Sequence, residues 1–296
     1  MRKTGQRART TVAVLTAALV GLTGCDVVGG DPPDEAGLGR QRKAPPAVVW
    51  DASPASIAAV GDSITRGFNT CLVLSDCPEV SWSTGSSPEV RSLATRLLGR
   101  ARVASHSWNY AESGTMMKDL PEQMTRAAGR APQLVTVMTG ANDACRSSTS
   151  AMTPVADFRA DFRDAMRTLR KALPKTQVYV ASIPNLMRLW SEGRTNPLGK
   201  QVWKLGICPS MLGDADDLDA AANERRATVQ RRVEDYNAVL AEVCGADERC
   251  RYDGGAVYEY RFGTAQLSHW DWFHPSTDGQ ARLAEIAYRK VTGNKP

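Results

Sequence analysis

The stretch AAVGDSITRG, residues 58–67, ends a short apolar run in a Gly-Asp-Ser triplet and then reaches a second glycine. An apolar run of this length, bounded by turn residues, is typical of a buried strand. Ser63 therefore follows a predicted strand at residues 56–60, and Gly61 and Gly67 allow a sharp turn of the backbone there. A serine in this place is either a turn or capping residue or a nucleophile, and the rest of the sequence must distinguish the two.

Four further apolar runs are predicted to be strands. They lie at residues 101–105, 133–138, 177–182 and, more weakly, 250–260. Segments with helical periodicity separate or follow them, at residues 87–100, 155–173, 226–244 and 276–291. Strands that alternate with helices predict a parallel sheet with helices on both faces, and ligands bind such a sheet beyond the carboxyl ends of its strands.

The first 24 residues have the features of an export signal. Basic residues precede an apolar run that is too short to span a membrane. The run ends in LTGC, residues 22–25, which resembles a bacterial lipobox. We therefore expect residues 1–24 to be a lipoprotein signal peptide and Cys25 to be lipidated, with ordinary secretion as the alternative.

Residues 25–47 are rich in glycine, proline and charge, which predicts a flexible tether. Beyond them the sequence shows neither a repeat nor a second hydrophobic pattern, so residues 48–296 are predicted to form one catalytic domain. Removal of the four basic residues of the leader lowers the net charge from +5 to +1. Since basic residues are nowhere interleaved with aromatic ones, we expect no nucleic-acid partner.

Seven cysteines are present, and six remain when Cys25 is set aside. An even number suits disulfides in an oxidising compartment. No metal site is expected, because the sequence has no C-x-x-C and neither His269 nor His274 lies near a cysteine at zinc-ligand spacing. The predicted pairs are Cys71–Cys77, Cys244–Cys250 and, as the remaining two, Cys145–Cys208.

A nucleophilic serine needs a base, a group that orients the base, and donors for the developing oxyanion. The segment HWDWFHPSTDG, residues 269–279, places Asp271 and His274 three positions apart, so it can supply both base and orienting carboxylate. Gly114 and Asn142 follow two other apolar runs and are candidate donors.

Two other histidines compete for the role of base. His106 has no carboxylate close in sequence and is predicted to be structural. His269 precedes Asp271 by two residues and remains an alternative, although the spacing to Asp271 favours His274.

In this order, four short blocks resemble the SGNH, or GDSL, hydrolase superfamily across residues 56–290. The blocks are GDS (61–63), AESG (111–114), GAND (140–143) and DWFHP (271–275). A closer similarity, to the phospholipase B-like branch, comes from GDSIT (61–65), SWSTG (81–85), GANDAC (140–145) and FHPST (273–277).

The resemblance implies an α/β fold, a flavodoxin-like three-layer sandwich with a mainly parallel five-stranded sheet. It also implies a serine lipase or esterase in which Ser63 is the nucleophile, His274 the base and Asp271 the orienting residue. The oxyanion hole would consist of the Ser63 and Gly114 N–H groups and the Asn142 amide. The family requires no metal and no organic cofactor.

A long insertion at residues 185–217 does not resemble the branch. Its apolar side chains either line an acyl-chain pocket or lid, or form a satellite core. They are Leu186, Met187, Leu189, Trp190, Trp203, Leu205, Met211 and Leu212.

These patterns together predict an exported esterase or lipase, anchored to the cell membrane by lipid, that hydrolyses carboxylic esters through an acyl-enzyme. A carbohydrate acetylesterase and a non-catalytic surface lipoprotein are the alternatives. The expected partners are an ester of a lipid, small molecule or glycan and, through the anchor, the membrane. The chain is expected to be a monomer.

Overall fold

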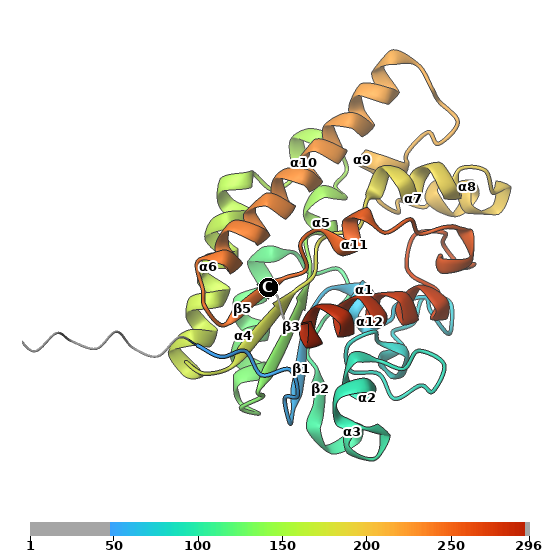
Figure 1. Ribbon diagram of the computed structural model, residues 1–296. Helices are drawn as coiled ribbons and strands as arrows, with labels where there is room; N and C mark the ends of the chain where they lie inside the picture. The colour runs from blue at the N-terminus through green and yellow to red at the C-terminus, as the bar shows by residue number, and fades with distance from the viewer. Residues whose placement is uncertain (1–47, 294–296) are drawn as a thin grey trace, which may run out of the picture. The chain divides into compact units, whose positions relative to one another are not determined.

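The computed structural model describes residues 48–293 and contains a five-stranded sheet (Figure 1). The spatial order is β2-β1-β3-β4-β5, and every pair of neighbours is parallel. Every residue of β1 and β3 is buried, as expected of strands covered on both faces. The strands are β1 (Ile57–Gly61), β2 (Ser107–Asn109), β3 (Leu134–Met138), β4 (Gln177–Val180) and β5 (Cys250–Tyr252).

Helices form a layer on each side of this sheet. On one side α4 (Leu120–Ala128) packs on α6 (Val155–Ala172), and α6 packs on α10 (Ala220–Gly245). On the other side α2 (Leu93–Leu98) packs on α12 (Thr277–Thr292), as Figure 1 shows. The parallel five-stranded sandwich expected from the sequence is thus confirmed, and its strand order places the switch point between β1 and β3.

The remaining helices are short and lie in the connections. They are α1 (Ser63–Arg66), α3 (Arg100–His106), α5 (Ala141–Ala144), α7 (Leu186–Gly193), α8 (Pro197–Trp203), α9 (Pro209–Leu212), α11 (Ala256–Glu259) and the 3₁₀ turns Pro78–Val80, Met117–Asp119, Thr149–Ala151 and Thr264–Gln266.

The second predicted strand was wrong. Residues 101–105 belong to helix α3, and strand β2 begins only at Ser107. Val103 is the one buried residue of α3, and the arginines and alanines around it have high helix propensity. The weakest predicted strand was too long, since β5 ends at Tyr252 and α11 occupies residues 256–259.

The insertion at residues 185–217 is folded onto the domain as α7, α8 and α9, which Figure 1 shows beside α5. Trp203, Met211 and Leu212 are almost completely buried and belong to the main core. Leu205, by contrast, is 84% exposed. The insertion therefore extends the core, and only a few of its apolar residues remain outside.

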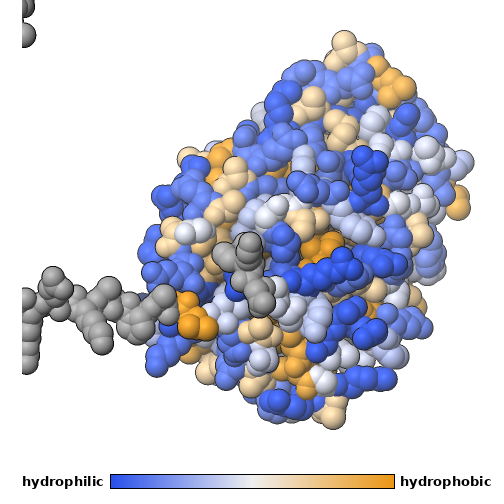
Figure 2. All heavy atoms as spheres, viewed as in Figure 1, coloured by the Kyte–Doolittle hydropathy of each residue, from blue (hydrophilic) through white to orange (hydrophobic). Residues whose placement is uncertain are grey.

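The structure contains the three disulfides expected from the sequence, Cys71–Cys77, Cys145–Cys208 and Cys244–Cys250. The predicted signal peptide, Cys25 and the predicted tether lie outside the described residues. Across residues 48–293, no helix is both long enough and apolar enough to cross a membrane. The face shown in Figure 2 is mostly hydrophilic, with hydrophobic residues in small separate groups.

The two ends of the described chain lie side by side. Trp50 Nε1 donates a hydrogen bond to the carbonyl of Val291, near the end of α12, at 2.9 Å. The guanidinium of Arg251 lies over the Trp50 ring, 4.3 Å from its centroid. These contacts hold Trp50 between the end of α12 and Arg251 of strand β5.

Candidate active site

The turn between β1 and α1 presents Ser63 at the carboxyl end of the sheet. Gly61 has φ +139°, and a Cβ there would lie 2.0 Å from the carbonyl oxygen of Met138 on β3. The Asp62 carboxylate caps α1, because its Oδ1 accepts a hydrogen bond from the Ile64 N–H at 3.0 Å. Ser63 is thus the first residue of a capped helix, and its side chain lies at the carboxyl end of the inner strand β1.

Ser63, His274 and Asp271 form a continuous hydrogen-bonded chain. Ser63 Oγ lies 2.8 Å from His274 Nε2, and His274 Nδ1 lies 2.6 Å from Asp271 Oδ2. All three side chains are buried. With the ring proton on Nδ1, the imidazole donates to Asp271 and leaves Nε2 free to accept the proton of Ser63.

The Asp271 carboxylate is held by more than the histidine. Its Oδ1 accepts the N–H groups of Phe273 and His274, both at 2.9 Å, and its Oδ2 accepts from Asn69 Nδ2 at 2.5 Å. Burial acts to raise the pKa of Asp271, but the His274 charge and these hydrogen bonds outweigh it and hold the pKa below its usual value. Asp271 is therefore ionised at neutral pH and ready to stabilise an imidazolium.

Sequence reasoning missed two of the residues that hold Asp271 in place. Asn69 adopts φ +57° and reaches Asp271 across 202 positions of sequence. Trp203, from the insertion, donates its indole N–H to the Asp271 carbonyl at 2.8 Å. Asparagine is enriched at positive φ, but nothing in the local sequence indicates its distant partner.

The candidate oxyanion donors border the same site. Within residues 48–293, neither the Ser63 nor the Gly114 N–H donates a hydrogen bond to another group. Gly114 has φ +86° and lies exposed in the β2–α4 connection. Asn142 Nδ2 donates one hydrogen to the Thr115 carbonyl at 2.8 Å, which fixes the amide and leaves its second hydrogen for a ligand.

An open groove of about 390 Å³ joins these groups. Ser63, His274, Gly114 and Asn142 all line it. Apolar walls are supplied by Phe68, Ile207 and Phe273, and the Cys145–Cys208 disulfide also faces the groove. The candidate nucleophile, base and oxyanion donors therefore meet around one accessible space.

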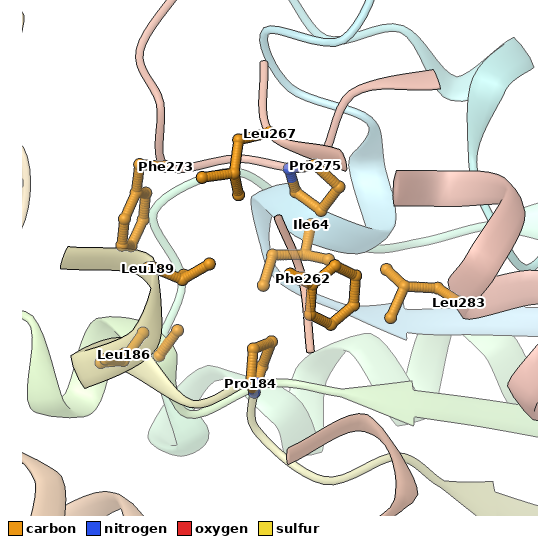
Figure 3. Close-up of a pocket in the computed structure, with 10 residues that line it drawn as sticks. Ile64, Pro184, Leu186, Leu189, Phe262, Leu267, Phe273, Pro275 and Leu283 are labelled. Carbon is orange, nitrogen blue, oxygen red and sulfur yellow. The ribbon is translucent and has the colours of Figure 1, made fainter. Parts of the chain in front are cut away.

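A second, wholly apolar cavity shares Phe273 with the groove (Figure 3). Ile64, Ala141 and Phe273, the chain neighbours of Ser63, Asn142 and His274, line it together with Leu186 and Leu189 of the insertion. Its volume of about 20 Å³ is close to that of a single water-sized probe. Phe273 lines both spaces and forms part of the wall between them.

Neither of the other two histidines reaches the triad. His106 ends α3, and its Nδ1 is hydrogen-bonded to Ser105 Oγ at 2.7 Å. His269 is exposed, and its ring packs against Trp270 with centroids 4.2 Å apart. The structure therefore brings His274, of the three histidines, to Ser63.

A family model described as GDSL-like Lipase/Acylhydrolase matches residues 57–287, which include every residue of the site. The chain belongs to this family. In the GDSL-like motif of this member, Ile64 replaces the leucine, and its side chain is buried in the core. The substitution therefore keeps an aliphatic residue where the fold requires one.

Several solved structures are similar to this chain at low sequence identity. The lipase Lip_vut3 from a goat rumen metagenome is 15% identical, with a TM-score of 0.50 over 81% of this chain and 98% of that chain. The extracellular lipase from Streptomyces rimosus is 20% identical, with a TM-score of 0.44 over 79% of this chain and 99% of that chain. Phospholipase A1 from Streptomyces albidoflavus NA297 is 19% identical, with a TM-score of 0.47 over 82% of this chain and 100% of that chain. No curated protein sequence matches the chain.

Within residues 48–293 of this GDSL-like protein, one group of side chains has the spacing of metal ligands, Cys71, Cys77 and Glu79. Its two cysteines are joined in a disulfide and offer no thiolate. The group therefore lacks the ligands that a zinc ion would require.

Proposed function

We propose that this protein is an exported serine esterase or lipase that hydrolyses carboxylic esters through an acyl-enzyme intermediate. The observation that carries the proposal is the hydrogen-bonded chain from Ser63 Oγ through His274 to the ionised Asp271, at 2.8 and 2.6 Å. Membership of the GDSL-like family supports the same reaction class.

In the first half of the reaction Ser63 Oγ attacks the ester carbonyl while His274 Nε2 takes the serine proton. Asp271 stabilises the resulting imidazolium, and the Ser63 and Gly114 N–H groups with the Asn142 amide bind the oxyanion. Collapse of the tetrahedral intermediate breaks the C–O bond of the ester, and the imidazolium gives its proton to the departing alcohol. Water then replaces the alcohol, and the same steps release the carboxylic acid and restore the serine.

Part of the groove wall suits an apolar acyl group. Phe68, Ile207 and Phe273 line the groove and offer apolar contacts to an acyl chain, while polar groups line the rest of it. The blocks shared with the phospholipase B-like branch agree with a lipid ester as substrate. A series of p-nitrophenyl esters tests this point: we expect turnover of chains longer than acetyl, and activity confined to acetate would indicate a carbohydrate acetylesterase.

Replacement of Ser63 tests the reaction itself. Ser63→Ala is expected to lower kcat by about three orders of magnitude or more while the protein stays folded, because only binding and the oxyanion donors remain. A fluorophosphonate should label the wild type and not this variant. Ser150→Ala, at an exposed serine, is the matched control and should keep both label and turnover. A wild type that neither hydrolyses esters nor takes the label would instead indicate a non-catalytic surface lipoprotein.

The membrane location is proposed from the sequence LTGC and the Gly/Pro-rich segment that follows it. A diacylglyceryl group on Cys25, together with a further chain, would anchor the mature protein, since stable anchoring requires two or more acyl chains. Cys25→Ser should keep the esterase activity and leave the membrane fraction, or accumulate as precursor. Mature-sized Cys25→Ser protein that stays with membranes would contradict lipidation.

A further inference from the structure

Large apolar side chains are exposed at seven positions within residues 48–293, and four of these belong to segments that adjoin the active-site groove. Leu72, Val73 and Leu74 are consecutive in the loop closed by Cys71 and Cys77, with exposed fractions of 62%, 51% and 78%. Leu205, on the insertion, is 84% exposed. Contiguous exposed aliphatic residues usually indicate an interaction surface.

The loop is built to hold these residues outward. The Cys71–Cys77 disulfide closes it, and Leu74 adopts φ +53°, which is unusual for a branched residue. Asn69 supports the tip from below, because its Oδ1 accepts the Leu74 N–H at 2.5 Å and its own N–H donates to the Ser75 carbonyl at 3.0 Å. The positive φ lowers the stability of the protein, and the loop nevertheless holds apolar side chains in water. This arrangement indicates that the exposed side chains have a function.

The loop stands on one side of the groove. Phe68, which lines the groove, precedes it, and Asp76, which follows the tip, accepts a hydrogen bond from Ser113 Oγ at 2.5 Å. Ser113 also lines the groove. The loop that carries the three aliphatic residues is thus joined to the rim of the groove next to Gly114.

Leu205 approaches the groove from the insertion. The two residues after it, Gly206 and Ile207, line the groove, and the residue before it is the exposed Lys204. Lys204 borders a separate surface pocket that Lys200, Asp214 and Asp216 also line. Two different segments that supply residues to the groove, or are joined to it by a hydrogen bond, therefore carry exposed aliphatic side chains.

We propose that Leu72, Val73, Leu74 and Leu205 insert into the surface of a phospholipid bilayer and seat the groove over its ester substrate. The inference rests on the proposed function and names the physical form of the substrate, a lipid in a membrane. A bilayer fits the pattern because the aliphatic side chains project into water from two segments that adjoin a groove proposed to bind lipid esters, and such side chains are stabilised at the boundary between headgroups and hydrocarbon. A stable protein–protein interface needs about 20–30 residues on each side, and the four exposed aliphatic residues are far fewer.

Vesicle binding tests the proposal without catalysis. The mature chain, residues 25–296, carries Cys25→Ser so that no anchor contributes and Ser63→Ala so that lipid is not consumed. Sedimentation with vesicles of equimolar phosphatidylcholine and phosphatidylglycerol gives the affinity. We expect the combined Leu72→Ser, Val73→Ser, Leu74→Ser and Leu205→Ser variant to bind about 10- to 100-fold more weakly.

Val49→Ser is the matched control, because Val49 is as exposed as Leu205 but lies with Gln133 and Gln177 at the amino ends of the strands. It should bind vesicles like its parent. In the Ser63 background, the combined variant should hydrolyse a soluble p-nitrophenyl ester at the parental rate and lose activity on vesicles.

Vesicle affinity that is unchanged in the combined variant, or absent in the parent, would overturn the proposal. The proposal would also fail if the parent were a dimer, the combined variant a monomer, and the vesicle affinity of the two the same. The four residues would then mediate self-association. Vesicle binding that depends on the four residues, in a protein that hydrolyses no ester, would contradict the proposed function and leave the docking surface standing.

Discussion

Asp62, between the glycine and the serine of the triplet, has a carboxyl group outside the hydrogen-bonded chain of Ser63, His274 and Asp271. One of its oxygens caps α1, while Oδ2 is buried with no hydrogen-bond partner among the described residues. Burial raises the pKa of this carboxyl to about 7, although the Ile64 N–H and the His274 charge act in the opposite direction. Asp143, whose pKa burial raises to about 6, adds to the effect.

A pH-dependent loss of stability follows from Asp62. The pKa of Asp62 is higher in the folded than in the unfolded chain. Asp62 therefore does not lower the free energy of unfolding below about pH 4. Its destabilising effect grows as the pH rises to about 7 and stays constant above that pH. Asp62→Asn keeps the oxygen that caps Ile64 and removes the charge. Compared with the variant, the wild type should lose roughly 2–4 kcal/mol of unfolding free energy between about pH 4 and about pH 8. Urea unfolding at both pH values measures this, and an equal difference at both would contradict it.

At this scale the sequence predicted the residues whose chemistry is local. Asp271 and His274 are neighbours in one short segment, and Ser63 follows a recognisable strand, so spacing was informative. Asn69 and Trp203 were missed because they act on Asp271 from 202 and 68 positions away. Such contacts arise only when the fold brings distant segments together.

The end of β1 is the element on which the position of Ser63 depends. A Cβ at Gly61 would overlap the Met138 carbonyl of the adjacent strand, and φ +139° is unfavourable for any other residue. Gly61→Ala should therefore destabilise the protein by about 3 kcal/mol or more and lower activity with it. Denaturant midpoints and ester turnover measure the two effects.

Gly245, the last residue of α10, is the matched control, because a Cβ there meets nothing within 4 Å. Gly245→Ala should be neutral or stabilise by up to about 1 kcal/mol. Similar losses in both variants would show that the Met138 contact does not determine the turn.

Strands were predictable where burial was complete and failed where it was partial. β1, β3 and β4 are buried at every position and coincide closely with predicted apolar runs. The edge strands β2 and β5 have three residues each, all half-buried, and their sequences carry little hydrophobic pattern. The run at residues 101–105 was predicted as a strand in place of β2 because it contains the apolar Val103, but Val103 is buried on the inner face of helix α3.

For the molecule as a whole, the Cys145–Cys208 disulfide joins the β3–α5 end of the sheet to the insertion. It closes the longest of the three disulfide loops, with a sequence separation of 63. In the chain-entropy model, Cys145→Ser with Cys208→Ser should lower stability by about 4 kcal/mol, against about 2 kcal/mol for the pair Cys244→Ser with Cys250→Ser. Both cysteines of the first pair line the groove, so that variant should also lose activity.

Thermal unfolding and ester turnover of the two double variants give the comparison. Equal stability losses would mean that loop length does not decide the contribution of the disulfides. The insertion itself was predicted as a segment, with a pocket or lid and a satellite core left as alternatives, because its buried tryptophan and methionine carry no periodicity that distinguishes a lid from a packed layer.

The hydrogen bond between Trp50 and Val291 has a practical consequence for engineering. It holds both ends of the described chain together at the finish of α12, whose sixteen residues extend about 24 Å from the segment that carries His274. A domain whose ends adjoin can be circularly permuted or spliced into a loop of a host protein. A fluorescent protein or immobilisation tag attached at either end would thus leave the approach to Ser63 unobstructed.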